Sequence, residues 1–591
     1  MKKHFFSAFA ILLSLLLLLT SCKGVNLNDN TKTDDPNQNQ NLIPQVGFDS
    51  WATGDHATNF TVLESDLSAF DLEFSKRDLA HEVVPINPTT IQFSGDKVTI
   101  SSAKAKRGDD GAIHIYSEGT YVLSGSSQNA RIVVDASQAD KITILLNGVS
   151  IHSPNGPAIY VKAADKVTIN IVKDTENTLS DGTSYTFTDG DSTPSAVIYS
   201  KDDLAINGYG KLTLQGNKKH GIVSKDDLVI TGGIIDVTSM GVAIEGKDNV
   251  KIGGGTFTLL AGTDGIRSDN VTDAHRGFVY VKDATISAVC GNDGIQASNA
   301  VIIDGGSIEI TTMGSEDPTA SAKGIKSDSD VVIRGGNLTV TAYEDAINAK
   351  KSVVVSGGTM TLDAIDDAIN ADLDVIVRDG QINVANSGVA IKAQDVLIAG
   401  GALSLLSEND GIKASDKTDV TSGNIAVTGG YLYVSAKKDC LDASASIIIT
   451  GGVTLIDGES IDKNATMNAA ASIAISGGVL IATGSSDTVK NVTTASNQGV
   501  MKVNFSEQSA NTPLVVCDAN GKVIVSVSPT KKFSAALISA PALQKDNTYT
   551  LYTGGTVTDA NTNGYAENVA YAKGTSLLTV TFTTNVYKQP K

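Results

Sequence analysis

A glycine-centred turn recurs through the middle of the chain at intervals of about 22 residues. Most copies of the turn start with Gly-Gly, whereas Asp283 and Asp379 open two of them. Intervals of 26, 29 and 30 residues also occur, and we interpret them as the same repeat with an insertion. Such a period indicates a repetitive fold in which each unit packs on its neighbours. The turns begin at residues 232, 254, 283, 305, 335, 357, 379, 400, 429, 451 and 477.

Each repeat has the pattern of a set of short strands. An apolar run such as Val353–Val355 precedes the turn, and an alternating run such as Thr359–Leu362 follows it. The bias towards β-branched residues favours strand over helix. Repeats of three short strands stack about 4.8 Å apart around an apolar column, and parallel crossovers are right-handed. We therefore expect an all-β, right-handed parallel β-helix. A β-propeller would need longer repeats of four antiparallel strands.

The repeats also set the expected domain boundaries. We expect the β-helix over residues 106–495 and a small C-terminal β-domain or cap over 496–591, where the repeat fades. A cap protects the strand edges that a terminal repeat leaves open. Residues 47–105 form a mixed N-terminal region or cap, in which the charged segment from Asp71 to His81 is expected to be a short helix.

The N-terminus has the features of a bacterial export signal. Residues 1–21 combine the basic pair Lys2 and Lys3 with an apolar core, and small residues precede Cys22. We expect 1–21 to be removed and Cys22 to be lipidated, with 22–46 as a polar, flexible tether. The protein would then be anchored in the cell envelope, at the outer membrane or cell surface. An ordinary signal peptide with a chance cysteine is the alternative.

The charge of the exported chain limits its partners. Without Lys2 and Lys3 it carries 44 basic and 65 acidic residues, a net charge of −21. A chain this acidic repels nucleic acid and anionic lipid, so we expect no nucleic-acid partner and membrane contact through the lipid alone. It also repels an acidic polysaccharide, unless a divalent cation lies between them. We expect a monomer.

A second signature, Asp-Gly/Ala-Ile, precedes most turns by twelve residues. The stacking of repeats would align this position in a column, in which acids form three sets separated by Lys323 and Val389. Strict alternation would point Asp345 inward, but the residue belongs to a turn, where we expect the chain to bend. The sets are Asp264 and Asp293; Asp345 and Asp367; and Asp410, Asp439 and Glu459.

Carboxylates on adjacent repeats repel one another, so either a proton or a cation should lie between them. Calcium suits the column because it accepts six to eight oxygen ligands in flexible geometry. The middle set is the richest, since Glu344, Asp366, Asn348 and Asn370 flank its two column residues. We therefore expect calcium at one set at least. The alternative is a ladder of stacked turn residues without metal.

Several linked segments resemble the calcium-containing, carbohydrate-binding β-helix family whose fold is similar to that of pectate lyases. The resemblance covers about residues 90–555 and implies binding of polysaccharide, of uronate polymers such as pectin above all, with cellulose as a further ligand. Of the family's metal ligands, only the Asp positions of the column can be carried over. The segments are Gly119–Gly125, Ile144–Val149, Glu176–Gly182, Ser200–Leu204, the Asp-Gly-Ile repeats and Leu551–Gly555.

Three functions remain open at this point. A lyase that acts by β-elimination needs calcium and a strong base near the sugar. The candidate bases lie three residues after the column position, and of these only Arg267 and Lys413 share a repeat with a column Asp. We expect these two residues to contact ligand and favour binding without turnover, with the lyase as alternative. A structural surface stalk or adhesin is the third possibility.

The aromatic content separates two classes of glycan. Flat cellulose surfaces are usually held by coplanar aromatic rings. Here aromatic residues make up 5% of the chain, and the regular repeats carry the isolated Tyr280, Tyr343, Tyr431 and Tyr433. We therefore expect an acidic polyuronate, bridged by calcium, rather than crystalline cellulose.

Overall fold

The computed structural model describes residues 67–186, 194–314, 321–416, 422–460, 464–495 and 498–589. Within these ranges the chain is all-β, with the 3-10 helix η1 (Leu67–Ala69) before the first strand. Cys22 and the expected tether lie outside them. No helix among the described residues has the length and apolar character needed to cross a membrane. Residues 69–591 form one unit.

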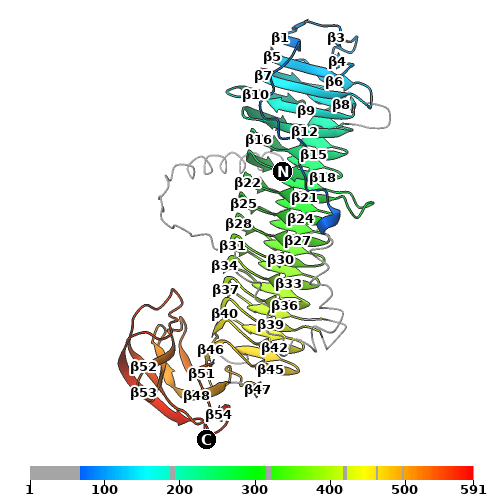
Figure 1. The fold of residues 1–591 in the computed structure, drawn as a ribbon. Helices are drawn as coiled ribbons and strands as arrows, with labels where there is room; N and C mark the ends of the chain where they lie inside the picture. Colours follow the sequence, from blue (N-terminus) through cyan, green and yellow to red (C-terminus); the bar gives the residue numbers. More distant parts are fainter. Residues whose placement is uncertain are drawn as a thin grey trace. The chain divides into compact units, whose positions relative to one another are not determined.

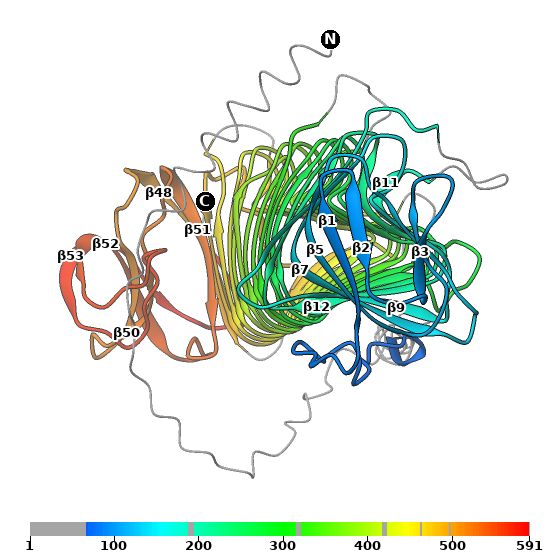
Figure 2. The ribbon, with the colours of Figure 1, turned by 90° about the horizontal axis from the view of Figure 1, so that it is seen from above.

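Parallel strand ladders dominate the structure (Figure 1). The chain returns to the same ladder after three strands, as when β12 pairs with β15 and β15 with β18. Each repeat thus adds one strand to each of three ladders, and successive repeats overlie one another when viewed from above (Figure 2). The predicted all-β chain with long parallel stacking is confirmed.

The first ladder has short strands and runs parallel after an initial antiparallel pair. Its strands are β3 (Ala105–Arg107), β4 (Ile113–Ile115), β6 (Ile132–Asp135), β8 (Ile159–Ala163), β11 (Ala196–Ser200), β14 (His220–Ser224), β17 (Ile244–Gly246), β20 (Ile266–Ser268), β23 (Ile295–Ala297), β26 (Ile325–Ser327), β29 (Ile347–Ala349), β32 (Ile369–Ala371), β35 (Ile391–Ala393), β38 (Ile412–Ala414), β41 (Leu441–Ala443) and β44 (Met467–Ala469).

The second ladder follows the first within each repeat. Its strands are β9 (Lys166–Ile171), β12 (Asp203–Gly208), β15 (Asp227–Ile230), β18 (Asn249–Ile252), β21 (Phe278–Val281), β24 (Ala300–Ile303), β27 (Asp330–Ile333), β30 (Val353–Val355), β33 (Asp374–Val377), β36 (Asp395–Ile398), β39 (Ile425–Val427), β42 (Ser446–Ile449), β45 (Ser472–Ile475) and β47 (Thr494–Ala495).

The third ladder lies after the glycine turn. Its strands are β10 (Glu176–Asp181), β13 (Lys211–Gly216), β16 (Ile234–Ser239), β19 (Thr256–Ala261), β22 (Thr285–Cys290), β25 (Ser307–Thr312), β28 (Asn337–Ala342), β31 (Thr359–Ala364), β34 (Gln381–Asn386), β37 (Ala402–Ser407), β40 (Tyr431–Ala436), β43 (Val453–Asp457) and β46 (Val479–Gly484).

The two ends depart from this pattern. At the start, β1 (Thr89–Ser94) pairs with β2 (Lys97–Ile100) and β5 (Gly119–Ser127), and β7 (Lys141–Ser153) joins β5 to β9 and β10. At the far end, β48 (Gly499–Gln508), β51 (Phe533–Ala540) and β54 (Val586–Lys588) pair onward from β46. A separate sheet contains β49 (Leu514–Asp518), β50 (Val523–Val527), β52 (Thr548–Val557) and β53 (Tyr571–Thr581).

One apolar cluster fills the interior of the stacked repeats. Ile347 from the first ladder, Val353 from the second and Leu362 from the third are all fully buried in it. The same cluster extends from Ile91 to Leu537. Repetition of the apolar positions therefore produces one continuous column of side chains, which stabilises each repeat against its neighbours.

The segment from Asp71 to His81 is not the short helix that its charge pattern suggested. It has no helical residue, and its side chains bond to strands of different repeats. Asp71 pairs with Lys251 of β18 at 3.0 Å, and Asp78 pairs with Lys166 of β9 at 2.7 Å. The local backbone bonds amount to a turn, in which Leu79 donates its N–H to the carbonyl of Ser75 at 3.2 Å.

The predicted turns place their second glycine in the left-handed region, where a Cβ is disfavoured. Gly452 has a φ of +71°, and a Cβ there would lie 2.6 Å from the carbonyl oxygen of Gly430 in the preceding repeat. Gly148 has a similar φ of +70°, with no atom within 4 Å of the same position. The two residues therefore share a backbone conformation, but only Gly452 has the backbone of a neighbouring repeat close to its Cβ position.

We expect Gly148→Ala to lower the stability of the folded chain by about 1 kcal/mol through its backbone conformation. Gly452→Ala should cost a further ~1–3 kcal/mol because its methyl group meets the neighbouring backbone. Thermal unfolding followed by circular dichroism should rank the apparent Tm as wild type, Gly148→Ala, Gly452→Ala. Equal Tm values for the two variants would contradict the close stacking of the turns.

Candidate functional site

The predicted aspartates lie two residues before the strands of the first ladder, and backbone hydrogen bonds hold them in register. Gly265 donates its N–H to the carbonyl of Asp293 at 3.0 Å, and Ala346 donates to that of Asp367 at 3.1 Å. Gly411 donates in the same way to Asp439 at 2.9 Å. The column positions therefore follow one another from repeat to repeat. The chain bends at Tyr343, Glu344 and Ala346, as expected beside Asp345.

Glu459 does not belong to this column, and its placement there was wrong. Cys440 donates its N–H to the carbonyl of Ala465 at 3.1 Å, so Ala465 follows Asp439. The extra residues of this longer repeat lie between β43 and β44, before the column position. They move that position further from the preceding turn than in most repeats, so a count from that turn places it too early. Glu459 instead forms an ion pair with Lys531 at 3.0 Å.

In five of the six column aspartates, all but Asp367, one carboxylate oxygen accepts a backbone N–H of the next repeat. The Oδ1 atom of Asp345 accepts the backbone N–H of Asp367 at 3.1 Å, and that of Asp410 accepts the N–H of Asp439 at 3.2 Å. Asp293 accepts the N–H of Lys323 at 2.9 Å. These carboxylates act as links between repeats. The contacts of their Oδ1 atoms are those of the alternative, a ladder of turn residues without metal.

The other carboxylate oxygen, Oδ2, bonds to side chains of a second column. This column is formed by the residues three positions after the aspartate position of each repeat. Arg267 donates to Oδ2 of Asp264 at 2.9 Å, and Lys413 donates to Oδ2 of Asp410 at 2.9 Å. The same column supplies a cation from the following repeat to two further carboxylates. These pairs are Lys326 with Asp293 at 3.1 Å and Lys392 with Asp367 at 2.7 Å.

These contacts define the chemistry of the candidate bases. Arg267 also pairs with Glu245 at 2.7 Å, and Lys413 also pairs with Asp442 at 3.1 Å. Burial alone would lower the pKa of Lys413, but its hydrogen bonds to the two carboxylates raise that pKa above the ordinary value. Glu245 and Asp264 likewise raise the pKa of Arg267 against the effect of burial. Both side chains therefore stay protonated, which is the wrong state for a general base.

The middle set differs from the others in its charge balance. Asp345, Asp366 and Asp367 each place a carboxylate oxygen within 4.8 Å of the other two. Asp345 is 3% exposed and accepts hydrogen bonds from the amides of Asn348 at 2.7 Å and Asn370 at 3.1 Å. Within the described ranges, no lysine or arginine forms an ion pair with Asp345.

The surroundings of this set disfavour its fully ionised state. Burial raises the pKa of Asp345, although the hydrogen bonds from Asn370 and Asp367 and the charge of Lys323 partly oppose it, and the nearby Asp366 acts with burial. Burial also raises the pKa of Asp367, although Lys392 partly opposes it. Glu344 of the predicted set is engaged elsewhere, in an ion pair with Lys323. The three aspartates therefore favour the uptake of positive charge.

The donor set fits a hard divalent cation. Three carboxylates converge, and rotation of the Asn348 and Asn370 amides would present carbonyl oxygens in place of their N–H groups. Calcium takes such oxygen ligands in flexible geometry. The sets at Asp264/Asp293 and Asp410/Asp439 fit less well, because Arg267, Lys326 and Lys413 already neutralise three of their four carboxylates.

A second acidic corner was missed by sequence reasoning. Asp203, Asp226 and Asp227 bring carboxylate oxygens within 4.8 Å of one another. They lie where the second ladder begins, in two copies of the sequence Ser-Lys-Asp-Asp-Leu at 200–204 and 224–228. The first copy contributed only to the family resemblance. The recurrence of the same five residues in adjacent repeats was the signal that two carboxylate pairs would stack.

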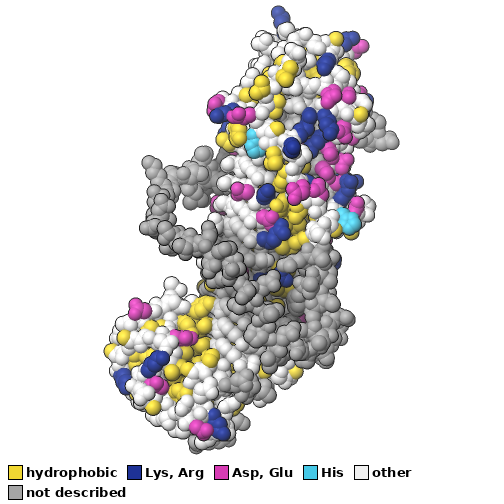
Figure 3. Space-filling model, viewed as in Figure 1, with side chains coloured by type: hydrophobic (Ala, Val, Ile, Leu, Met, Phe, Trp, Pro, Cys, Tyr) yellow, Lys and Arg dark blue, Asp and Glu magenta, His cyan; other side chains and the backbone are white. Residues whose placement is uncertain are grey.

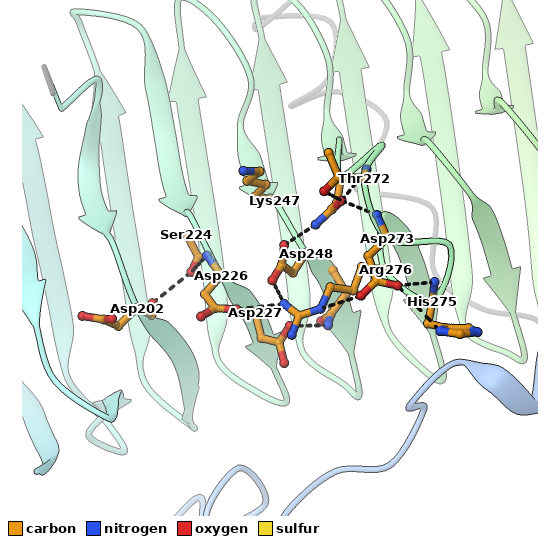
Figure 4. A network of polar contacts seen from close by, with 12 residues as sticks. Asp202, Ser224, Asp226, Asp227, Lys247, Asp248, Thr272, Asp273, His275 and Arg276 are labelled. Atoms are coloured by element: carbon orange, nitrogen blue, oxygen red, sulfur yellow. Dashed lines mark hydrogen bonds and ion pairs between the residues drawn. The ribbon is translucent and has the colours of Figure 1, made fainter. Parts of the chain in front are cut away.

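Arginine closes one side of this corner (Figure 4). Arg276 extends from the loop between β20 and β21, pairs with Asp226 at 3.2 Å and also pairs with Asp248. Asn249 donates to Asp227 at 2.5 Å. Burial, followed by the charges of Asp227 and Asp226, raises the pKa of Asp203 to about 6. On the face in Figure 3, acidic and basic side chains intermingle over this part of the ladders.

The raised pKa of Asp203 predicts a pH-dependent stability. An unfolded aspartate loses its proton near pH 3.9, whereas folded Asp203 holds it to about pH 6. The folded state therefore binds more protons in this interval, and its stability decreases as pH rises through it. In EDTA, we expect Asp203→Asn to raise the apparent Tm at pH 8 and to change it little near pH 3.5, where the aspartate is protonated in both states. An equal effect at both pH values would contradict the shift.

Comparisons with known proteins found a family match, a relative and a solved structure. The sequence matches the family described as carbohydrate-binding domain-containing protein over residues 109–368 and 362–511. A relative of the same description from Acetivibrio thermocellus is 33% identical over 227 residues, which make up 38% of this chain and 79% of the relative. A solved structure described as the polysaccharide lyase-like protein from C. thermocellum, gadolinium derivative, shares 32% sequence identity with a TM-score of 0.37, covering 39% of this chain and 93% of that chain.

The two family matches together span most of the stacked repeats, including the middle acidic set and the Asp203 corner. The match extends over more than half of the whole sequence. This chain therefore belongs to the family of carbohydrate-binding domain-containing proteins.

Proposed function

We propose that the protein is a right-handed parallel β-helix that binds an acidic polysaccharide through calcium and does not cleave it. The family match supports carbohydrate as the ligand class. The convergence of Asp345, Asp366 and Asp367, with no ion pair between Asp345 and a lysine or arginine within the described ranges, is the observation that carries the calcium site. The steps of three strands along each parallel ladder support the β-helix, and strand twist favours its right hand.

Calcium resolves the electrostatic problem of an acidic glycan. The exported chain has a net charge of −21, so a polyuronate meets repulsion at long range. A divalent cation held by three aspartates offsets most of their charge and leaves coordination positions open for a ligand carboxylate, because calcium accepts more oxygens than this set supplies. We propose that a uronate carboxylate completes the coordination. Neutral cellulose would gain nothing from this site.

The state of the basic residues supports binding without turnover. Burial lowers the pKa of Lys392, the basic residue next to the middle set, but the contact with Asp367 raises it by more. The pKa of Lys392 therefore lies above its ordinary value. A protonated lysine cannot abstract the proton that β-elimination requires. The same argument applies to Arg267 and Lys413. A structural stalk would explain the stacked repeats but not the unbalanced acids.

We also propose that Cys22 carries a lipid and anchors the protein in the cell envelope, where it would act as a monomer. The small residues before Cys22 and the apolar run of the first 21 residues support this placement. The anchor would position the β-helix near polysaccharide outside the cytoplasm.

Calcium binding can be measured directly by isothermal titration calorimetry. We expect Asp345→Asn to weaken the affinity about tenfold or more, because it removes one ligand charge from the middle set. Asp410→Asn is the matched control, since it alters a column carboxylate that already pairs with Lys413. It should leave the affinity unchanged. Similar losses for both variants would show that calcium does not select the middle set.

Glycan binding should depend on the same ion. We expect the protein to be retained on immobilised polygalacturonate with calcium and to be released by EDTA, whereas crystalline cellulose should retain it weakly in both conditions. Retention that resists EDTA would contradict calcium bridging. In the same samples, absorbance of unsaturated uronate products at alkaline pH should stay at the background level, and a steady increase would establish lyase activity instead.

A further inference from the structure

Two exposed apolar side chains lie directly beside the middle acidic set. Tyr343 is 49% exposed and precedes Glu344, while Ile365 is 67% exposed and precedes Asp366. The backbone N–H of Ile365 donates to the carbonyl of Ala342 at 3.2 Å, which fixes the two residues on neighbouring repeats. Two exposed apolar side chains thus occur on adjoining repeats, each two residues before a column aspartate of the middle set.

The ring of Tyr343 is held in place from one side. A Cβ on Gly314 would lie 2.4 Å from Cγ and Cδ1 of the ring, so the ring lies against the glycine backbone. Gly314 has a φ of +69°, which also favours glycine. The backbone N–H of Tyr343 donates to Oγ1 of Thr312 at 3.0 Å, and this hydroxyl donates to the carbonyl of Ala322 at 2.7 Å. The ring is therefore supported before any ligand arrives.

The other tyrosines of the regular repeats do not offer such a surface. Tyr280 is 4% exposed and donates its hydroxyl to Asp304, and Tyr433 is 5% exposed. The hydroxyl of Tyr431 accepts a hydrogen bond from Asn561. Among these four, Tyr343 alone combines large exposure with a position next to the unbalanced carboxylates.

We propose that Tyr343 and Ile365 form a platform for the pyranose ring of the uronate whose carboxylate binds at Asp345, Asp366 and Asp367. This inference rests on the calcium-bridged binding proposed above and adds a residue that determines specificity. A sugar ring has an apolar face and polar edges, which suits an aromatic ring that supplies a large contact at low entropic cost. The tyrosine ring would contact the face of one sugar unit while the calcium binds the carboxylate of the same unit.

The sharpest test compares Tyr343 variants of the full chain with two ligands, calcium alone and polygalacturonate in the presence of calcium. We expect Tyr343→Ala to weaken polygalacturonate binding about tenfold, whereas Tyr343→Phe keeps the ring face and should stay within about twofold of wild type. Tyr209→Ala is the matched control, because Tyr209 is 52% exposed but lies in the turn between β12 and β13. Calcium affinity should be unchanged in all three.

The results separate this inference from the function on which it rests. Normal glycan affinity of Tyr343→Ala, in a protein whose binding still requires calcium, would overturn the platform and leave calcium bridging intact. Equal losses for Tyr343→Ala and Tyr343→Phe would also overturn it, because the hydroxyl rather than the ring face would then act. Failure of the wild type to bind polygalacturonate with calcium would overturn both proposals.

Discussion

Backbone hydrogen bonds between successive repeats place each residue next to its equivalent in the following repeat. This constraint produces the continuous apolar column of the interior, because an apolar position repeats as an apolar stack. It applies equally to charged positions. Once the Asp-Gly/Ala-Ile signature recurs, the register of the first ladder brings Asp345 next to Asp367 and Asp410 next to Asp439. The fold therefore concentrates negative charge wherever an acid recurs, and that charge must be balanced.

The chain balances most of this charge with its own side chains. Arg267, Lys326 and Lys413 pair with column aspartates, often across two repeats. Their contacts join the repeats and neutralise the aspartates. At Asp345 the equivalent positions are Asn348 and Asn370, which donate hydrogen bonds but carry no charge. Asp264, Asp293 and Asp410 each pair with one cation from these positions, whereas Asp345 receives two amides, and this difference is why we propose that an external cation binds there.

Much of the fold was accessible from the sequence because local chemistry and repeat length agree. The glycine turns were predicted from their spacing, and their left-handed backbone, as at Gly452, explains why glycine recurs there. The column of aspartates followed from the same spacing. Glu459 was misplaced because an insertion before the column position cannot be located from the distance to the turn alone. The helix expected at 71–81 failed because its charged residues bond to distant strands.

The charge balance was harder to predict than the column. Lys326 bonds to an aspartate 33 residues earlier, so its role depends on side-chain direction between repeats and not on spacing within one. The most direct measurement is an anomalous difference map from crystals of the protein grown with terbium as a calcium substitute. We expect a strong peak between Asp345, Asp366 and Asp367. Peaks at Asp264/Asp293 and Asp410/Asp439, with none at the middle set, would contradict it.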